Sequence, residues 1–184
     1  MVEITLSIVL QIVQTIALIV GVYYYISTIR TNQRNQRMAE EARQMQIMLA
    51  IGVDQDEVSV KRRLDLMKMK WKDYDDFNAK YGSDVNPDNY LKRNIVWNQW
   101  DVLGQMLKRG LVDREVLFER TFSSPYYYWA KFGDVIKENR VRYNQPLSFL
   151  HFEYLTEECR KYLEEKGFNT TIPDIWLSYE PDTQ

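Results

Sequence analysis

The sequence contains few of the residues that build metal centres and covalent active sites. Among its 184 residues there is one cysteine, Cys159, and one histidine, His151. A single cysteine excludes an intramolecular disulfide and a cysteine-rich metal site, and it is typical of a protein in a reducing cytoplasm. A single histidine excludes metal sites that need several imidazoles. We therefore expect no metal and no cofactor.

Motifs for catalysis are also missing. The sequence has no glycine-rich phosphate loop, no Walker lysine and no G-x-S-x-G turn. His151 and Cys159 are eight positions apart on one predicted helix, about 12 Å of rise, so they cannot form a dyad within that helix. We interpret His151 as an ordinary polar helix residue and Cys159 as an unreactive, semi-buried thiol.

One acidic group deserves comparison with a calcium loop. Asp73, Asp75 and Asp76 lack the alternating ligand spacing and the central glycine of such a loop. We interpret them as a solvated helix end. With no recognisable site for chemistry, we predict that the protein is not an enzyme.

Glycine and proline are scarce, whereas aromatic residues are abundant. There are seven glycines and five prolines, and aromatic residues make up 14% of the chain. This composition favours a packed, mostly regular domain over a disordered one. The net charge of −2 argues against nucleic acid as a partner, because proteins that bind nucleic acids need a basic surface.

The most informative stretch is a charge-free apolar run over residues 4–29. A helix of this length exceeds the roughly 30 Å of a bilayer's hydrocarbon core, so the run predicts a transmembrane helix. A cleaved signal sequence is the alternative, but the leader Met1 to Glu3 carries an acid instead of bases, and no small-x-small cleavage site follows. The lipid bilayer is therefore an expected partner.

The orientation of this helix follows from the charges beside it. Arg30, Arg34 and Arg37 follow the apolar run, whereas only Glu3 and the α-amine precede it. Positively charged flanks stay on the cytoplasmic side. We predict a single-pass protein of the inner (plasma) membrane with a cytoplasmic C-terminal domain.

Four small or polar residues inside the apolar run share one helical stripe. Ser7, Gln11, Gln14 and Gly21 follow a 4, 3, 7 spacing. Small and amide-bearing residues let helices approach and bond to each other in lipid, so the stripe predicts a helix-contact face. The alternative is that the glutamines are merely tolerated. The partner is either another copy of the chain or a different membrane subunit.

The helix is expected to continue beyond the membrane, because no glycine or proline lies between Val22 and Ile51. An apolar seam in this extension predicts a short parallel coiled coil. Packing of the seam on the protein's own domain is the alternative, since two heptads are too few to decide. The seam consists of Met38, Ala42, Met45 and Leu49.

The rest of the chain predicts a helical domain with no convincing strand pattern. Residues 1–29 form the anchor, 30–52 the juxtamembrane helix and linker, and 53–184 the cytoplasmic domain. Apolar spacing predicts helices over 57–81, 90–109, 114–120, 124–143 and 147–166. The fold class is thus all-α, a transmembrane helix followed by a bundle of four to five helices.

Local signals set the ends of these helices. The sequence 82–89 predicts a turn, and residues 168–184 an extended strap with apolar side chains that dock on the domain. The start signals are Asp54 or Asp56, Asp113, and Ser124 followed by Pro125; the stop signals are Gly110 with Leu111, and Gly167.

Three segments resemble a family of prokaryotic membrane-anchored helical proteins that is described only as a domain of unknown function. These are WDVLGQMLKRGLVDREVL (100–117), YYYWAKFGDVIKENRVRY (126–143) and FEYL (152–155). The resemblance supports the fold and implies no catalytic residue and no ligand. It also suggests a contact among Trp129, Arg140 and Glu153.

Taken together, these features predict an interaction or scaffold module that associates with itself at the membrane. Two alternatives stay open at this point. One is an accessory subunit of a larger membrane complex, and the other is a membrane-tethered enzyme whose site carries no known motif.

Overall fold

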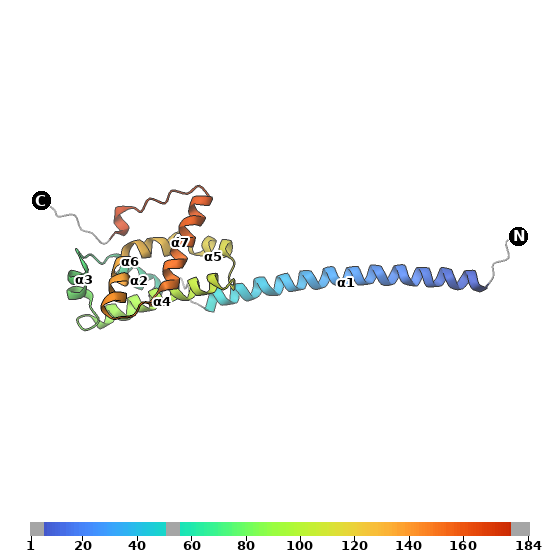
Figure 1. Cartoon of the computed structure of the whole chain (residues 1–184), viewed down its shortest axis with the longest axis horizontal. Coiled ribbons are helices and arrows are strands. Elements are labelled where there is room, and N and C mark those ends of the chain that lie inside the picture. Colours follow the sequence, from blue (N-terminus) through green and yellow to red (C-terminus); the bar gives the residue numbers. More distant parts are fainter. Residues whose placement is uncertain (1–5, 51–55, 178–184) are drawn as a thin grey trace. The chain divides into compact units, whose positions relative to one another are not determined.

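The computed structural model describes residues 6–50 and 56–177, and all regular secondary structure in this part of the chain is helical (Figure 1). It has seven α-helices and one short 3-10 turn, with no strand among the described residues. By its contacts the chain divides into two units, Met1–Gln46 and Ile47–Gln184. The predicted all-α fold class is confirmed.

Helix α1, Leu6–Ala50, is continuous over 45 residues, and its residues up to Gln46 are the described part of the first unit. The prediction that the apolar run continues into its polar extension is therefore confirmed. Of the side chains described between Leu6 and Gln46, all are exposed except that of Gln44, which is half-buried. Helix α1 is long and apolar enough to cross a membrane, and none of its most apolar stretch is buried.

The second unit contains the remaining elements. Their bounds are α2 Glu57–Met67, α3 Tyr74–Tyr81, α4 Pro87–Lys108, α5 Arg114–Thr121, α6 Ser124–Arg142, α7 Leu150–Glu165 and the 3-10 turn η1 Asp174–Trp176. Helix α7 packs against both α4 and α6 (Figure 1).

Most of the predicted end signals are confirmed. Asp56 accepts a hydrogen bond from Ser59 N, and Asp113 accepts bonds from the first turn of α5. Gly110 and Gly167 adopt positive φ angles of 67° and 74°, as Schellman-type stops require. Asp54, the alternative cap, lies outside the described residues.

Three helix starts differ slightly from the prediction. Helix α4 begins at Pro87 because the Asn86 side chain caps it. Residues 87–89, which were predicted to belong to the turn, are therefore helical. Helix α6 has Ser123 at its N-cap position, one residue before the predicted cap, and no side-chain bond there. Helix α7 begins at Leu150 instead of residue 147, after Phe149 in a left-handed conformation.

The prediction of one helix over 57–81 was wrong. The chain breaks between α2 and α3, and the side chains of Met69 and Trp71 in the break enter the core. Val60 and Leu64, two of the apolar residues whose spacing predicted a helix over 57–81, are exposed.

The break has a local cause as well. Asp73 accepts a hydrogen bond from Asp76 N, and the Asp76 carboxylate accepts one from Lys72 N, in an arrangement similar to a capping box. These acids therefore start α3 instead of ending a helix. The D-x-x-D spacing was the signal for this start.

The core is unusually rich in aromatic rings. Trp71 stacks on Phe132 with ring centroids 5.4 Å apart, and Trp97 and Phe77 meet the same cluster edge-on. Such aromatic pairs contribute about 0.5–1.5 kcal/mol each beyond their buried area. The cluster joins the break between α2 and α3 to α4 and α6.

Helices α4 and α7 approach each other very closely at Gly104. A Cβ atom at this position would overlap the backbone carbonyl oxygen of His151, so only glycine fits. One turn earlier on α4, Asp101 Oδ1 accepts hydrogen bonds of 2.9 Å from His151 N and Phe152 N. Phe149, at the N-cap position of α7, offers no side-chain bond. Asp101 therefore caps α7 from a different helix.

The described part of the C-terminal segment lies against α6, as the strap prediction requires. The rings of Tyr127 and Trp176 stack with an interplanar angle of 3° and a centroid distance of 5.5 Å. Tyr126 OH donates a hydrogen bond of 3.0 Å to Thr170 O. The strap contains the turn η1 and is followed as far as Leu177; its remainder lies outside the described residues.

Replacing Gly104 by alanine is expected to destabilise the protein by about 2–4 kcal/mol, because the new methyl group forces two backbones apart. Gly133→Ala is the matched control. A Cβ at Gly133 meets side-chain atoms alone, the nearest being Trp129 Nε1 at 2.9 Å, so a smaller loss of stability is expected than from a clash between two backbones. Urea unfolding of the full chain in detergent measures both. Equal stability of the two variants would contradict the role assigned to Gly104.

Candidate functional site

The surface of α1 is the first candidate site. Its apolar side chains are largely exposed, for example Leu18 at 69% and Val20 at 60%. Contiguous apolar surfaces of this extent are rare on proteins that face only water, so α1 requires lipid or another apolar surface around it.

The predicted contact stripe lies on this exposed helix. Ser7, Gln11, Gln14 and Gly21 are all exposed, and Thr15 Oγ1 bonds to Gln11 O within the helix. In the seam, Met38, Ala42 and Met45 are exposed, while the side chain of Leu49 lies outside the described ones. The stripe and the seam stay predictions.

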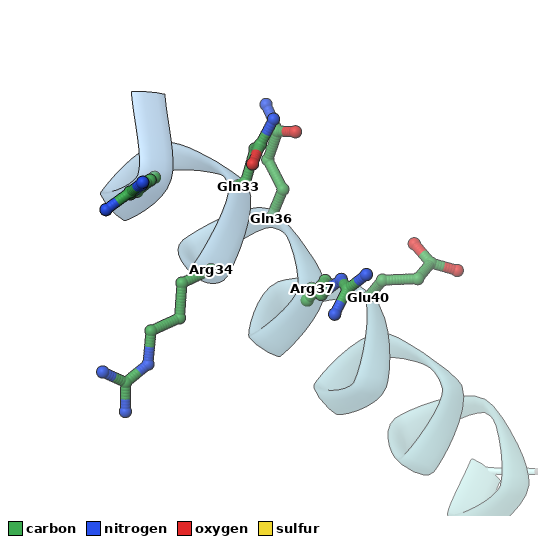
Figure 2. A pocket seen from close by; sticks show the side chains of 6 residues that line it. Gln33, Arg34, Gln36, Arg37 and Glu40 are labelled. Atoms are coloured by element: carbon green, nitrogen blue, oxygen red, sulfur yellow. The ribbon is translucent and has the colours of Figure 1, made fainter. Parts of the chain in front are cut away.

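Basic residues follow the apolar part of α1. Arg30, Arg34 and Arg37, with Gln33, Gln36 and Glu40, surround an open hollow along one helix. Figure 2 shows Arg34 extending away from Gln33 and Gln36, so these side chains do not converge on a common point. We interpret the hollow as space between solvated side chains. The segment supplies positive charge and no pocket.

The lone histidine and cysteine both have structural positions in α7. His151 Nδ1 lies 3.6 Å from Asp101 Oδ2. Cys159 is completely buried, which corrects the expectation of a semi-buried thiol, and its Sγ lies 3.5 Å from Phe122 O as a donor. Burial raises the pKa of the Cys159 thiol to about 12. A thiol with such a pKa is almost entirely protonated at neutral pH and therefore a poor nucleophile.

The suggested contact among Trp129, Arg140 and Glu153 is present. Arg140 Nη1 donates a 2.6 Å hydrogen bond to Glu153, and its guanidinium lies 5.8 Å from the centroid of the Trp129 ring. Arg140 also donates to the carbonyl oxygens of Ser148 and Phe149. The arginine therefore ties the end of α6 to the start of α7, which is a structural role.

Two buried cations were missed by the sequence reasoning. Arg93 on α4 is 4% exposed and Lys131 on α6 is 3% exposed. Each sits at helical spacing with buried aromatic residues, Arg93 with Trp97 and Trp100, and Lys131 with Tyr128. The sequence signal for these buried cations was a basic residue on an otherwise apolar helix face. The same pattern is common where an apolar face meets a solvated one, so it does not by itself indicate burial.

Lys131 joins three separate segments. Its Nζ donates to Met69 O at 2.7 Å and lies 3.5 Å from Leu177 O, and it sits 5.1 Å from the centroid of the Trp71 ring. Lys70 Nζ donates to the same Leu177 carbonyl at 2.9 Å. Helix α6, the break after α2 and the C-terminal strap thus meet at one ammonium group. Burial, with a smaller effect of Lys70, lowers the pKa of Lys131 to about 8.

The hydrogen-bond acceptors of Arg93, like those of Lys131, are all uncharged. Its Nη1 donates to Tyr81 O and, at 2.8 Å, to Asn89 Oδ1. No carboxylate among the described residues pairs with it, and its buried Nε has no hydrogen-bond partner. Burial lowers the pKa of Arg93 to about 10, so the guanidinium remains charged at neutral pH.

Beside Arg93 is a cavity of about 260 Å³ between α3, α4, the end of α6 and the loop before α7. Among the described residues, Arg93 is the only charged one that lines it, and no aspartate or glutamate does. Aromatic, amide and hydroxyl side chains form the walls: Phe77, Asn78, Ser83, Tyr90, Asn94, Trp97, Asn139, Tyr143, Gln145, Ser148 and Phe149, together with Ile136.

The low pKa of Lys131 makes stability depend on pH. Between about pH 8 and 10.5 the unfolded chain binds more protons at this lysine than the native one, so the free energy of unfolding rises with pH. Between about pH 8 and 10.5, we expect the free energy of unfolding of the unaltered full chain in detergent to rise by about 2–3 kcal/mol relative to that of Lys131→Met. Urea unfolding at several pH values measures the difference. A difference that stays constant with pH would contradict the assignment.

Comparison with known proteins finds one family, described as a domain of unknown function (DUF4760), whose model matches residues 11–159. This is more than half of the chain, which therefore belongs to that family, as the three resembling segments predicted. No curated protein and no solved structure matches the chain. The family description assigns no activity, ligand or site residue.

Proposed function

We propose, from the premise that this DUF4760 protein inherits no defined activity from its family, that it is a single-pass membrane protein with a helical interaction domain. In this proposal α1 anchors it in the plasma membrane, the bundle lies in the cytoplasm, and copies associate through α1. The observation that carries the proposal is the apolar surface of α1, which is exposed along the whole stretch suited to span a bilayer.

The energetics support an anchor. Removing apolar surface from water is worth about 25 cal/mol per Å², so a helix with this much exposed aliphatic surface partitions strongly into lipid. The bundle, in contrast, buries its own aromatic core. The chain therefore combines one part suited to lipid with one part suited to water.

The charges beside α1 support the orientation. Arg30, Arg34 and Arg37 are adjacent to the apolar stretch on the side of the bundle, and basic flanks are retained in the cytoplasm. A cytoplasmic bundle also agrees with its single reduced cysteine.

Self-association is supported by the stripe and the seam. Amide side chains in hydrocarbon are stabilised by hydrogen bonds to a neighbouring helix. The side chains of Gln11 and Gln14 are exposed on α1, which suits a contact between helices. An accessory subunit would use the same face toward a different helix. The enzyme alternative stays a prediction without a specific observation in its favour.

Labelling of an added cysteine tests the orientation. Val141 is 77% exposed at the end of α6, and the native Cys159 is buried with a raised pKa, so the Val141→Cys thiol is the reactive one. We expect a membrane-impermeant maleimide to label Val141→Cys only after intact cells are permeabilised. The unaltered chain is the control for background. Labelling in intact cells would place the bundle outside and overturn the orientation.

Replacing both glutamines tests self-association. Gln11→Leu combined with Gln14→Leu is expected to weaken dimerisation roughly tenfold, since each interhelical bond is worth about 0.6–1 kcal/mol. Ser27→Leu, on the opposite side of α1 at about 100° per residue, is the matched control. Energy transfer between labelled full chains in vesicles measures both. If the unaltered labelled chains show no energy transfer, self-association is contradicted. Co-purification with other membrane polypeptides in fixed ratio would favour the accessory subunit.

A further inference from the structure

We propose that the cavity beside Arg93 is a binding site for the carboxylate group of a small organic acid. The site lies wholly within the bundle, and it is independent of the proposed membrane contacts of α1. Neither the family description nor the sequence motifs assign it. Four observations carry the proposal: an uncompensated charge, a free edge of the guanidinium, aromatic walls, and a cavity without acids.

The charge on Arg93 has no counter-ion in the part of the chain that the structure describes. Other arginines of the bundle do have one: Arg140 pairs with Glu153, Arg142 with Glu138, and Arg160 with Glu157. These three arginines are more exposed than Arg93 and each has a carboxylate partner. Arg93 is more buried than they are and has none among the described residues. A buried charge without a counter-ion is costly, so an anion that reaches Arg93 offsets part of that cost, less the cost of desolvating the anion itself.

The hydrogen bonds of Arg93 leave one edge of the guanidinium free. Nη1 uses its two hydrogens on Tyr81 O and Asn89 Oδ1. Nε is buried and has no partner, and the hydrogen bonds of Arg93 to described residues come from Nη1 alone. The Nε and Nη2 hydrogens point in parallel from the planar group, which is the geometry that receives both oxygens of a carboxylate.

Aromatic rings hold the guanidinium in place. Its central carbon lies 4.9 Å from the ring centroid of Phe77, 5.4 Å from that of Tyr90 and 5.7 Å from that of Trp97. Trp97 Nε1 is a second buried donor without a partner, and Trp97 also lines the cavity. A fixed cation with an additional donor nearby loses little freedom when a ligand binds.

The cavity limits the class of ligand. Its 260 Å³ admits a small molecule, and one guanidinium is the only charge that the described residues contribute to its wall. A single positive charge balances a monoanion, whereas a phosphate dianion would be left under-neutralised. The amide and hydroxyl groups of the wall can bond to a polar substituent, and the aromatic rings can pack against an apolar one. A carboxylic acid with a compact body meets these conditions.

The test uses the full chain in detergent at pH 7 and constant ionic strength, with thermal unfolding as the readout. The probes are sodium acetate, sodium benzoate, neutral benzamide and inorganic phosphate. We expect acetate or benzoate to raise the melting temperature in a saturable way, as binding to the native state requires. Benzamide has nearly the same shape as benzoate without its charge, and it should have no such effect.

Variants identify the site. Arg93→Met is expected to abolish the carboxylate-dependent shift. Asn139→Asp adds a negative charge to the cavity wall and keeps the acceptor for the 2.6 Å bond from Tyr74 OH, so it should fold and should weaken binding at least tenfold. Asn169→Asp is the control, because Asn169 lies outside this cavity and keeps its bond from Thr171 N.

Several results would overturn the proposal. Equal shifts with benzoate and benzamide would remove the role of charge, and no shift with either carboxylate would remove the site. A shift with phosphate alone would show a site for a tetrahedral oxyanion instead. If Arg93→Met fails to fold, Asn139→Asp decides, and unchanged binding in that variant would place the anion elsewhere.

Discussion

The bundle depends on the contact between α4 and α7. At Gly104 the two backbones approach so closely that no side chain fits, and at Asp101 one carboxylate binds the exposed amides at the start of α7. The first interaction sets the distance between the helices, and the second sets where α7 begins. Because α7 also packs on α6, these two residues of α4 help to position most of the domain.

Asp101 and Gly104 also explain the start of the segment 100–117, one of the three segments that resemble the family. The run from Trp100 to Gly104 combines a core tryptophan, the cap of another helix, a core leucine and the close-approach glycine. Trp100, Asp101 and Gly104 each contact α7. A structural reason of this kind suffices for the segment through which the chain resembles its family, and no catalytic role has to be invoked for it.

The two buried cations show how similar burial can serve different ends. Lys131 bonds to carbonyl groups from the break after α2 and from the strap, so its ammonium is used to join segments. Arg93 binds two neutral acceptors with one nitrogen and leaves the other edge of its guanidinium unused. We attribute the first to folding and the second, as proposed above, to binding.

The proposed functions divide between the two units in the same way. Helix α1 has an apolar surface without cover in its own unit, and the interactions proposed for it are with lipid and with other helices. The bundle has a complete core, and the site proposed in it is a small cavity. The two proposals can therefore be tested separately, because neither uses a residue of the other.

Local signals in the sequence determined a large part of this protein. The glycine stops at Gly110 and Gly167 and the cap at Asp113 act within one or two helical turns, and the long apolar run is continuous in the sequence. All of them can therefore be recognised without knowledge of the fold. The break between α2 and α3 was missed because apolar spacing continued through it. There the local pair Asp73 and Asp76 and the burial of Trp71 prevailed over periodicity.

Only the tertiary structure decided which charged groups are buried. Arg93 and Lys131 resemble ordinary surface residues in the sequence, because whether a helix face is covered depends on elements far away along the chain. The Asp101 cap and the fit at Gly104 likewise join residues about 50 positions apart. Side-chain spacing reports on neighbours within a helix, whereas an uncompensated charge beside a cavity arises from the packing of several helices.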